Sequence, residues 1–554
     1  MDDDAVMSCD DPNQTTLNLA TLPIEVLDRI FGYLRPGIRP LNLPKYGDVS
    51  WLIDNNDDRM KRKTLHSLCR TIKRLRRSAT PLLYADIHIV GWRQERKVRH
   101  LPQGTSREVP TGEEGCVRQL TRLIRTISSC SHLAEYIQVI RCNQTLARRS
   151  KEVGLEQQEE DLVLAMGEAI SEGLPAMVQS LFNDQVASLW HDEFKGTPAK
   201  AQLTLLLWLS PNISELTLET YNGDLSRILG LELGSSRPGH YAKLATINIT
   251  EDFLVKVNDE PDQTDRLNCV FSQPESYDER IATFRYLPAL KHYRHRYPDD
   301  IHRSLLGPEA LRVDFEGNGL RNLSTLHLVD CKISMEQIIM TIRPCHRLVE
   351  FRFRLGCLRP YDERDDMPRV LDFELMCMAL LQSKDTMRYL SLSAKKAEGR
   401  FSDQTCTTLA VGTLNEFTKL QTLLVPAMIL TETPMIITYT SEEAHWDPDL
   451  TFPLEIVESL PTSITLLGLG NEKLRQPLEG SWHLYIADEA NRQLAMGIER
   501  LPNLRAVCIL HAAQRDIVYI PDLWDACLQK GIEYVVQNSL EGDAIPLKHY
   551  EINH

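Results

Sequence analysis

Apolar residues near the start of the chain follow the spacing of a helix. Between positions 21 and 34 they recur every three or four residues, so that they share one face of a helix. The apolar members of this stretch are Leu22, Val26, Leu27, Ile30, Phe31 and Leu34. Pro23 suits a first helical turn, and Glu25 falls near the positive end of the helix dipole. The pattern therefore predicts an amphipathic helix over residues 21–34.

Helical spacing returns over residues 64–79. The apolar positions there are Leu65, Leu68, Ile72, Leu75 and Ala79. We expect Pro81 to end this helix, because proline has no N–H for the helical hydrogen bond. The alternating residues 82–90 then predict a strand. Residues 35–64, with three prolines, two glycines and a charged run, predict a loop between the two helices.

A different pattern, L-x-x-L-x-L with aliphatic substitutes, recurs later in the chain. Its copies begin at Ile213, Leu244, Leu323, Leu348, Met387, Leu420, Ile464 and Leu504. Apolar helical stretches such as 335–345 and 373–384 lie between copies. One short strand and one helix per unit, stacked in order, is the architecture of leucine-rich repeats. An ordinary α/β domain with leucine-rich strands would also contain one such motif, but a series of copies favours the array.

The predicted fold is therefore α/β, with an N-terminal helical region followed by an irregular leucine-rich-repeat solenoid, an arc of short parallel strands backed by helices. The predicted parts are a disordered acidic tail at 1–16, the helical region at 17–85 with its loop at 35–64, the array at 86–536 with a helical insertion near 143–198, and a C-terminal tail at 537–554.

Composition and missing motifs narrow the function. The chain has 62 Lys and Arg against 77 Asp and Glu, and a net charge of −15 disfavours general nucleic-acid binding. The 13 cysteines are scattered without a C-x-x-C pair, which predicts reduced thiols in the cytoplasm or nucleus and no bound metal. No window is apolar enough to span a membrane. No nucleophile has a recognisable base partner, so we expect a non-enzyme without a cofactor.

The first predicted helix, TLPIEVLDRIFGYL, resembles the first helix of the F-box, whose usual form is L-P-x-E-[VIL]-L-x-x-I-[FL]-x-[YF]-L. Every fixed position is met: Leu22, Pro23, Glu25, Val26, Leu27, Ile30, Phe31, Tyr33 and Leu34. Residues 65–84 resemble the second half of the F-box in fungal proteins with degenerate repeats. The chain departs from the family at 35–64, because a typical F-box joins its helices through only a few residues. The alternative is that the first helix is an ordinary amphipathic core helix.

The resemblance implies a non-catalytic subunit of a ubiquitin ligase. In the family, the F-box docks on a Skp-type adaptor that bridges to a cullin scaffold, and the repeats hold the target protein for ubiquitin transfer. Carried onto this chain, the residues that contact the adaptor or complete the supporting core are Leu22, Pro23, Val26, Leu27, Ile30, Phe31, Leu34, Leu68, Ile72 and Leu75. The alternative function is a leucine-rich-repeat scaffold whose degenerate F-box assembles no ligase.

A basic stripe is the candidate substrate site. Residues between the strand leucines face the concave side of a repeat array. The basic ones among them are His292, Arg294, Arg296, His327, Arg352 and Arg354. Arginine forks suit carboxylates and phosphates, so we expect a protein substrate with an acidic or phosphorylated segment. The alternative is that these side chains pair with local acids. The unit near 290 is irregular, with Tyr293 and His295 in leucine positions.

Two further clusters keep alternatives open. His292, His295 and His302 lie close to Asp299 and Asp300, which would suit a metal site or a plain surface loop. The basic run at 59–77 would suit nuclear import or nucleic-acid binding, or form the exposed face of the F-box helices.

Overall fold

The computed structural model describes part of the chain, which divides into two compact units. The described residues are 22–34, 56–71, 73–89, 112–142, 190, 198–219, 229, 241–250, 284, 287–296, 318–331, 335–355, 371–394, 406–407, 411–426, 430, 456–471, 491–511 and 521–537. Unit 1 consists of Met1–Asn42 and Val49–Asp86, and unit 2 of Leu43–Asp48 and Ile87–His554. The predictions for the acidic tail, the C-terminal tail, most of the insertion near 143–198, Ile72 and the cluster around His302 fall outside the described residues.

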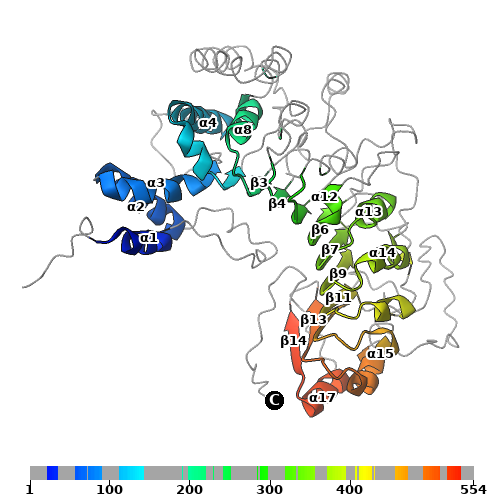
Figure 1. Ribbon diagram of the computed structural model, residues 1–554. Coiled ribbons are helices and arrows are strands. Elements are labelled where there is room, and N and C mark those ends of the chain that lie inside the picture. Colours follow the sequence, from blue (N-terminus) through cyan, green and yellow to red (C-terminus); the bar gives the residue numbers. More distant parts are fainter. Residues whose placement is uncertain are drawn as a thin grey trace, which may run out of the picture. The chain divides into compact units, whose positions relative to one another are not determined.

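Unit 1 is helical in its described part (Figure 1). The helices are α1 (Ile24–Tyr33), α2 (Asn56–Thr71) and α3 (Lys73–Ala85). The first turn of α1 is anchored on Pro23, whose carbonyl accepts hydrogen bonds from the N–H groups of Val26 and Leu27 at 3.1 Å each. Helix α3 packs against both α1 and α2. The buried hydrophobic cluster of this unit consists of Leu27, Phe31, Leu65, Leu75 and Ala79. Of the helix predicted at 21–34, residues 24–33 are helical as α1.

The loop predicted at 35–64 is wrong over its last part. Helix α2 begins at Asn56, so residues 56–63 are helical. This stretch is rich in lysine and arginine, which favour a helix but give no apolar periodicity.

Pro81 does not end the helix that contains it. Helix α3 continues through Pro81 to Ala85, and the predicted strand shrinks to β1 (Asp86–Ile89). Proline inside a helix costs about 3 kcal/mol. Leu82 and Leu83, which follow Pro81, pack against the buried core of unit 1. Their burial offsets the lost hydrogen bond and keeps this segment helical.

Unit 2 is built on a long sheet, which has twelve strands in the part that the structure describes. After β1 they are β2 (Val139–Cys142), β3 (Glu215–Glu219), β4 (Thr246–Thr250), β5 (His292–Arg296), β6 (Thr325–Cys331), β7 (Glu350–Leu355), β9 (Tyr389–Ala394), β11 (Thr422–Pro426), β12 (Leu466–Asn471), β13 (Ala506–His511) and β14 (Glu533–Gln537). The strands stand in chain order, and neighbours from β2 to β14 are parallel. Strands β8 (Leu371–Asp372) and β10 (Cys406–Thr407) pair separately. The predicted α/β fold with short parallel strands is confirmed.

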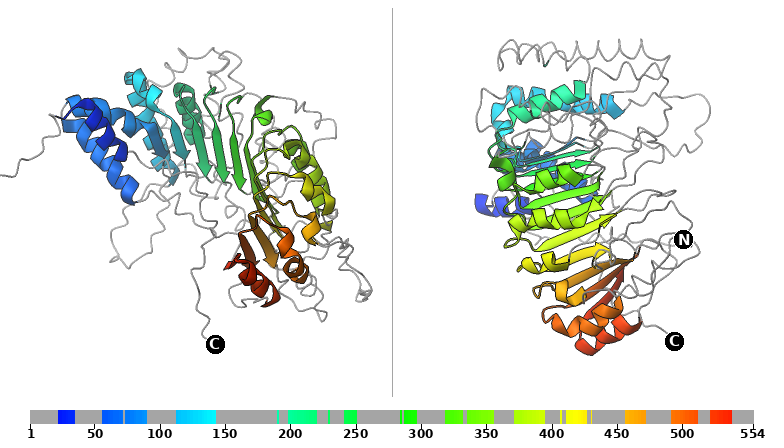
Figure 2. Two further views of the ribbon diagram at one scale, coloured as in Figure 1. Left: turned by 60° about the horizontal axis from the view of Figure 1, so that its bottom comes forward. Right: turned by 90° about the vertical axis from the view of Figure 1, so that its right-hand side faces the viewer.

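The described helices of unit 2 lie along one face of this sheet (Figure 2). They are α4 (Gly112–Ser129), α8 (Pro198–Leu209), α12 (Asn318–Arg321), α13 (Met335–Ile342), α14 (Phe373–Leu380), α15 (Ile456–Ser459) and α17 (Pro521–Lys530), with short 3₁₀ turns η3 (Ser131–Tyr136), η9 (Leu381–Ser383), η10 (Val411–Glu416) and η12 (Ile498–Arg500). The main core fills the space between helices and sheet. We call the opposite side of the sheet, formed by the strand residues that point away from these helices, the inner face.

The L-x-x-L-x-L motif forms a turn followed by a strand. Its first residue ends a turn: the N–H of Leu323 donates to the carbonyl of Leu320 at 3.1 Å. The same bond joins Leu244 to Tyr241, Leu290 to Leu287, Leu420 to Phe417 and Leu504 to Leu501, each at 3.1 Å. One carbonyl of the preceding unit then accepts two N–H groups at the strand entry, as Lys291 does from Ser324 at 2.8 Å and Thr325 at 2.9 Å. Every predicted copy of the motif leads into a strand. The irregular unit near residue 290 also leads into a strand, β5.

Side chains in the turns tie each unit to the one before it. The Nδ2 atoms of Asn212, Asn322 and Asn503 donate to the carbonyls of Glu135, Pro288 and Thr462 at 2.7, 3.1 and 2.9 Å. Asparagine therefore recurs at this position to satisfy a carbonyl that a turn leaves exposed.

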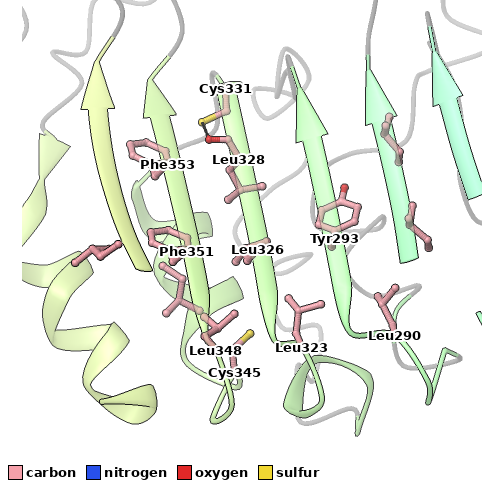
Figure 3. Close-up of a cluster of buried hydrophobic side chains, with 14 of the residues drawn as sticks. Leu290, Tyr293, Leu323, Leu326, Leu328, Cys331, Cys345, Leu348, Phe351 and Phe353 are labelled. Atoms are coloured by element: carbon pink, nitrogen blue, oxygen red, sulfur yellow. Dashed lines mark hydrogen bonds between the residues drawn. The ribbon is translucent and has the colours of Figure 1, made fainter. Parts of the chain in front are cut away.

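Core side chains of neighbouring strands lie in line (Figure 3). Leu326 and Leu328 of β6 lie beside Phe351 and Phe353 of β7, and all four are almost fully buried. Tyr293 takes a leucine position of β5 and is also fully buried. Its hydroxyl lies 2.9 Å from Nδ1 of His295, so the two irregular residues satisfy each other inside the core.

Candidate functional site

Strand register gathers the predicted substrate residues on three adjacent strands. Arg294 of β5 pairs in register with His327 of β6, which pairs with Arg352 of β7. The rows on either side hold His292 and Glu350, and Arg296 and Arg354. These positions alternate with the buried Tyr293, Leu326, Phe351 and Phe353, so they belong to the inner face. All six predicted residues are therefore neighbours; whether they bind a substrate stays a prediction.

Glu350 lies at the centre of this group. Its Oε1 accepts a hydrogen bond from Nε of Arg352 at 2.9 Å and lies 3.1 Å from Nε2 of His327. Burial alone would raise the pKa of Glu350, but the contact with His327 and the positive charges of Arg352 and Arg294 lower it to about 2. Arg352 and His327 therefore both contact a nearby acid, as the alternative to a substrate site expects. The signal was in the sequence: Glu350 and Arg352 are two residues apart on one strand and so share a face.

His327 and His292 are both held neutral by their surroundings. Burial lowers the pKa of His327 to about 4, and the charges of Arg352 and Arg294 add to the effect. Burial also lowers the pKa of His292, whose Nδ1 lies 3.0 Å from Oγ1 of Thr325. At neutral pH the positive charge of the basic stripe therefore comes from its arginines.

Arg352 also stacks on the next strand. Its guanidinium carbon lies 4.2 Å from the centre of the Tyr389 ring, which is a cation–π contact. Tyr389 pairs in register with Glu350, and Ser391 with Arg352. Strand alternation also places Tyr389, Ser391 and Ser393 on the inner face, but a search for charged side chains misses them because they carry no charge. Together with Arg352 and Arg354 they line a small hollow.

In unit 1 the predicted adaptor-docking residues divide into a core and a rim. Leu27, Phe31 and Leu75 are buried, so they support the helices. Leu22, Ile30, Leu34 and Leu68 are partly buried, while Pro23 and Val26 are exposed.

A second apolar stripe on α1 remains exposed. Val26 is 39% exposed, Ile30 is half-buried and Tyr33 is 83% exposed, at steps of four and three residues that place them on one face. Ile24 and Met60 add exposed apolar surface at 39% and 58%. Ile24, Tyr33 and Met60 were missed as surface residues, because an apolar period does not by itself tell which of two stripes is buried.

The basic run in α2 and α3 lies largely on the surface. Lys63, Arg70, Lys73 and Arg77 are exposed, and Nε of Arg76 donates to the carbonyl of Cys69 at 2.8 Å. Within the described ranges, no three His, Cys, Asp or Glu side chains are grouped to hold a metal ion. A membrane-crossing helix, judged by length and apolarity, is likewise not found among the described residues.

Comparison with known proteins adds no family to these observations. A scan against models of known protein families found no match to the chain, and a search of curated proteins found none either.

Proposed function

We propose that this chain is the substrate-recruiting subunit of a Skp–cullin–F-box type ubiquitin ligase. Unit 1 docks on a Skp-type adaptor, and through it on a cullin scaffold, while the repeat array of unit 2 holds the target protein. The observation that carries the proposal is the apolar stripe of α1, exposed beside a core that other residues of the same motif complete.

The stripe has the character of an interface. Large apolar side chains gain ~1.5–3 kcal/mol each when fully buried. Tyr33, 83% exposed, obtains little of this gain in unit 1, and Val26, 39% exposed, obtains only part of it. A partner that covers them would bring the remaining free energy of burial, reduced by the cost of the entropy lost on association.

The array supplies the other half of the proposal. Strands in chain order present aligned rows of side chains over a long inner face, and such faces are the usual binding surfaces of repeat proteins. The arginines of β5 and β7 give this face a local positive charge within an acidic chain, which suits an acidic or phosphorylated target.

Co-purification with a Skp-type adaptor tests the docking assignment. We expect the full chain to retain the adaptor, and Val26→Asp or Tyr33→Ala to lower the retained adaptor at least about tenfold, because each removes apolar contact at the interface centre. Leu528→Asp is the matched control, since Leu528 is 67% exposed on α17 in unit 2. Equal retention by all variants would rule out α1 as the docking surface.

A repeat scaffold that assembles no ligase is the second candidate. It is favoured by one observation, the 22 residues (34–55) between the end of α1 at Tyr33 and the start of α2 at Asn56, where the family joins its helices more closely. Failure of the unaltered chain to bind any Skp-type adaptor, with unit 1 folded, would select this function.

A further inference from the structure

The last unit of the array leaves an apolar face. Helix α17 and strand β14 stand at the end of the row of strands (Figure 1), and among the described strands β14 has a neighbour, β13, on one side only. Leu528 of α17 is 67% exposed, and Trp524, one turn before it, is half-buried. The Trp524 ring meets the Tyr534 ring of β14 edge to face, with 5.2 Å between ring centres. Apolar surface therefore remains where the terminal unit of a solenoid is expected to be polar.

This face points away from the rest of the array. Lys530 of α17 donates a hydrogen bond to Glu499 of the preceding unit at 3.0 Å, so that side of the helix faces back along the array. At ~100° per residue, Leu528 lies ~160° around the helix from Lys530. Trp524 precedes Leu528 by four residues and shares its side of the helix. The two apolar residues therefore stand where a further unit would pack.

The outer edge of β14 is suited to pairing with another strand. The N–H of Glu533 donates to the carbonyl of Arg505 at 2.8 Å, on the side of β13. Successive residues of a strand direct their backbone groups to opposite sides, so those of residues 534 and 536 point away from β13. Proline and lysine are the residues that most often protect an edge strand from pairing, and β14 contains neither.

An antiparallel pair of β14 strands has a natural centre at Val535. The backbone groups of Val535 point toward β13, so the two copies of this residue would form a non-hydrogen-bonded pair, flanked by hydrogen bonds of residues 534 and 536. In this register Glu533 stands opposite Gln537. The carboxylate, which is the only charge in the sequence of β14, therefore meets an amide rather than a second carboxylate.

The same two-fold axis also suits the helix. From Glu533 to Val535 the strand rises ~6.6 Å, and from Lys530 back to Ala526 the helix rises ~6 Å. An axis that passes Val535 therefore passes α17 near Ala526. Antiparallel helices centred there set Trp524 of one copy, two residues before the centre, against Leu528 of the other, two residues after it.

We propose that two copies of this chain associate end to end through this face, with β14 paired to β14 and α17 packed on α17 about one two-fold axis. A second copy is the occupant that the geometry favours, because a single axis satisfies the strand edge and the helix face together, as a self-complementary interface requires. All residues involved belong to unit 2, so the proposal is independent of adaptor docking by unit 1.

The size of the face predicts a weak dimer. Five strand residues span ~17 Å, and one sheet layer with one helix layer is ~20 Å deep, so the outline is roughly 340 Å². A standard interface buries ~800 Å² on each partner. Asp525, exposed at the rim of the face, adds repulsion between the two copies. We therefore expect monomer and dimer to exchange at micromolar or higher concentration.

Sedimentation of the full chain over a range of concentrations tests the proposal. We expect a dimer whose dissociation constant rises at least about tenfold with Leu528→Asp, because the change puts a carboxylate into the apolar contact. Met378→Asp is the matched control, since Met378 is 52% exposed on α14. It should leave the dimer unchanged. Leu528→Asp should still retain the adaptor, so loss of the dimer is distinguishable from failure of docking.

A cysteine placed on the axis tests the register. The two Val535→Cys residues would have Cα atoms ~4.5 Å apart, within the ~4.4–6.8 Å of a disulfide, so oxidation should give a covalent dimer. Cys508 pairs in register with Val535, so the test is made with Cys508→Ala in place. Glu533→Cys in the same background should not cross-link, because its two copies would lie ~13 Å apart along the strands. If Leu528→Asp does not fold, this pair of variants decides.

A full chain that stays monomeric at every concentration would overturn the inference, as would a dimer that Leu528→Asp leaves unchanged. So would a monomer that dimerises only after removal of residues 538–554, because the occupant of the face would then be this segment of the same chain. Cross-linking through Glu533→Cys in place of Val535→Cys would contradict the antiparallel register.

Discussion

His327 and Glu350 are coupled because each affects the charge state of the other, and the charge of Arg352 acts on both. Glu350 stays ionised beside Arg352, and His327 stays neutral because it is buried next to two arginines. Removing one partner from such a group leaves a charge without compensation. His327 and Glu350 are therefore expected to respond to pH together.

Acidification should destabilise the array through His327. Its folded pKa of about 4 lies below the ordinary 6.5, so the unfolded chain binds the proton more readily. The stabilisation is complete above pH 6.5 and is lost as the pH falls from 6.5 toward 4, on the order of 3 kcal/mol. Glu350 continues the trend at lower pH, because its folded pKa of about 2 lies below the ordinary 4.5.

Urea unfolding at several pH values measures this dependence. His327→Gln should lose less free energy of unfolding than the unaltered chain between neutral pH and about pH 4, since glutamine does not titrate there. The same loss in both proteins would show that His327 does not carry the effect.

At the scale of elements, the C-terminal cap of helix α17 shows how a helix ends and leads into the next strand. Gly531 follows α17 with φ at 66°, and its N–H donates to the carbonyl of Leu528 at 3.2 Å. The N–H of Ile532 donates to Cys527 at 2.9 Å, which completes a Schellman motif. Ile532 then packs on the main core and leads into β14.

Replacing Gly531 tests the importance of this cap. Gly531→Ala should lower the free energy of unfolding by roughly 1–2 kcal/mol, because a side chain disfavours the left-handed region. No described atom lies within 4 Å of the added Cβ, so the effect is conformational. Gly531→Asn should lose less, since asparagine tolerates this region. Thermal unfolding compares the two, and an alanine variant as stable as the unaltered chain would contradict the argument.

The sequence predicted elements well where burial sets a period and poorly where it does not. Leu326 and Leu328 reveal β6 because alternate residues of a half-buried strand must be apolar. Residues 56–63 of α2 are almost all polar, so their helix left no period to detect. The prediction that Pro81 ends its helix was wrong because it rested on the local helix propensity of proline alone. The packing of Leu82 and Leu83, which keeps the segment helical, depends on contacts distant in sequence.

The candidate site was predictable in part for a related reason. Register follows from the motif, so the rows that hold Arg294, His327 and Arg352 could be aligned without a structure. The stacking of Arg352 on Tyr389 could not, because it depends on side-chain rotamers across two strands.

At the scale of the whole molecule, the two units have separate buried cores. Phe31 is fully buried in unit 1 and Phe351 in unit 2, and they belong to different clusters. Damage to one core should therefore leave the other intact.

Hydrogen exchange resolved by segment measures this independence. Phe31→Ala should cost about 3–5 kcal/mol and speed exchange in α1 and α3, with β6 and β7 unchanged. Phe351→Ala should do the reverse. Equal acceleration in both units from either change would mean that they unfold together.

Each strand of the long sheet from β3 to β14 is placed by hydrogen bonds from the residues at its start to the carbonyl just before the neighbouring strand. The connection between β6 and β7 has 18 residues (332–349) and that between β4 and β5 has 41 (251–291), yet both pairs keep the same register. The lengths of these connections are thus free to change during evolution without moving the rows of the inner face. A binding surface built this way tolerates insertion and deletion nearby, and new specificities can arise by substitution at fixed positions.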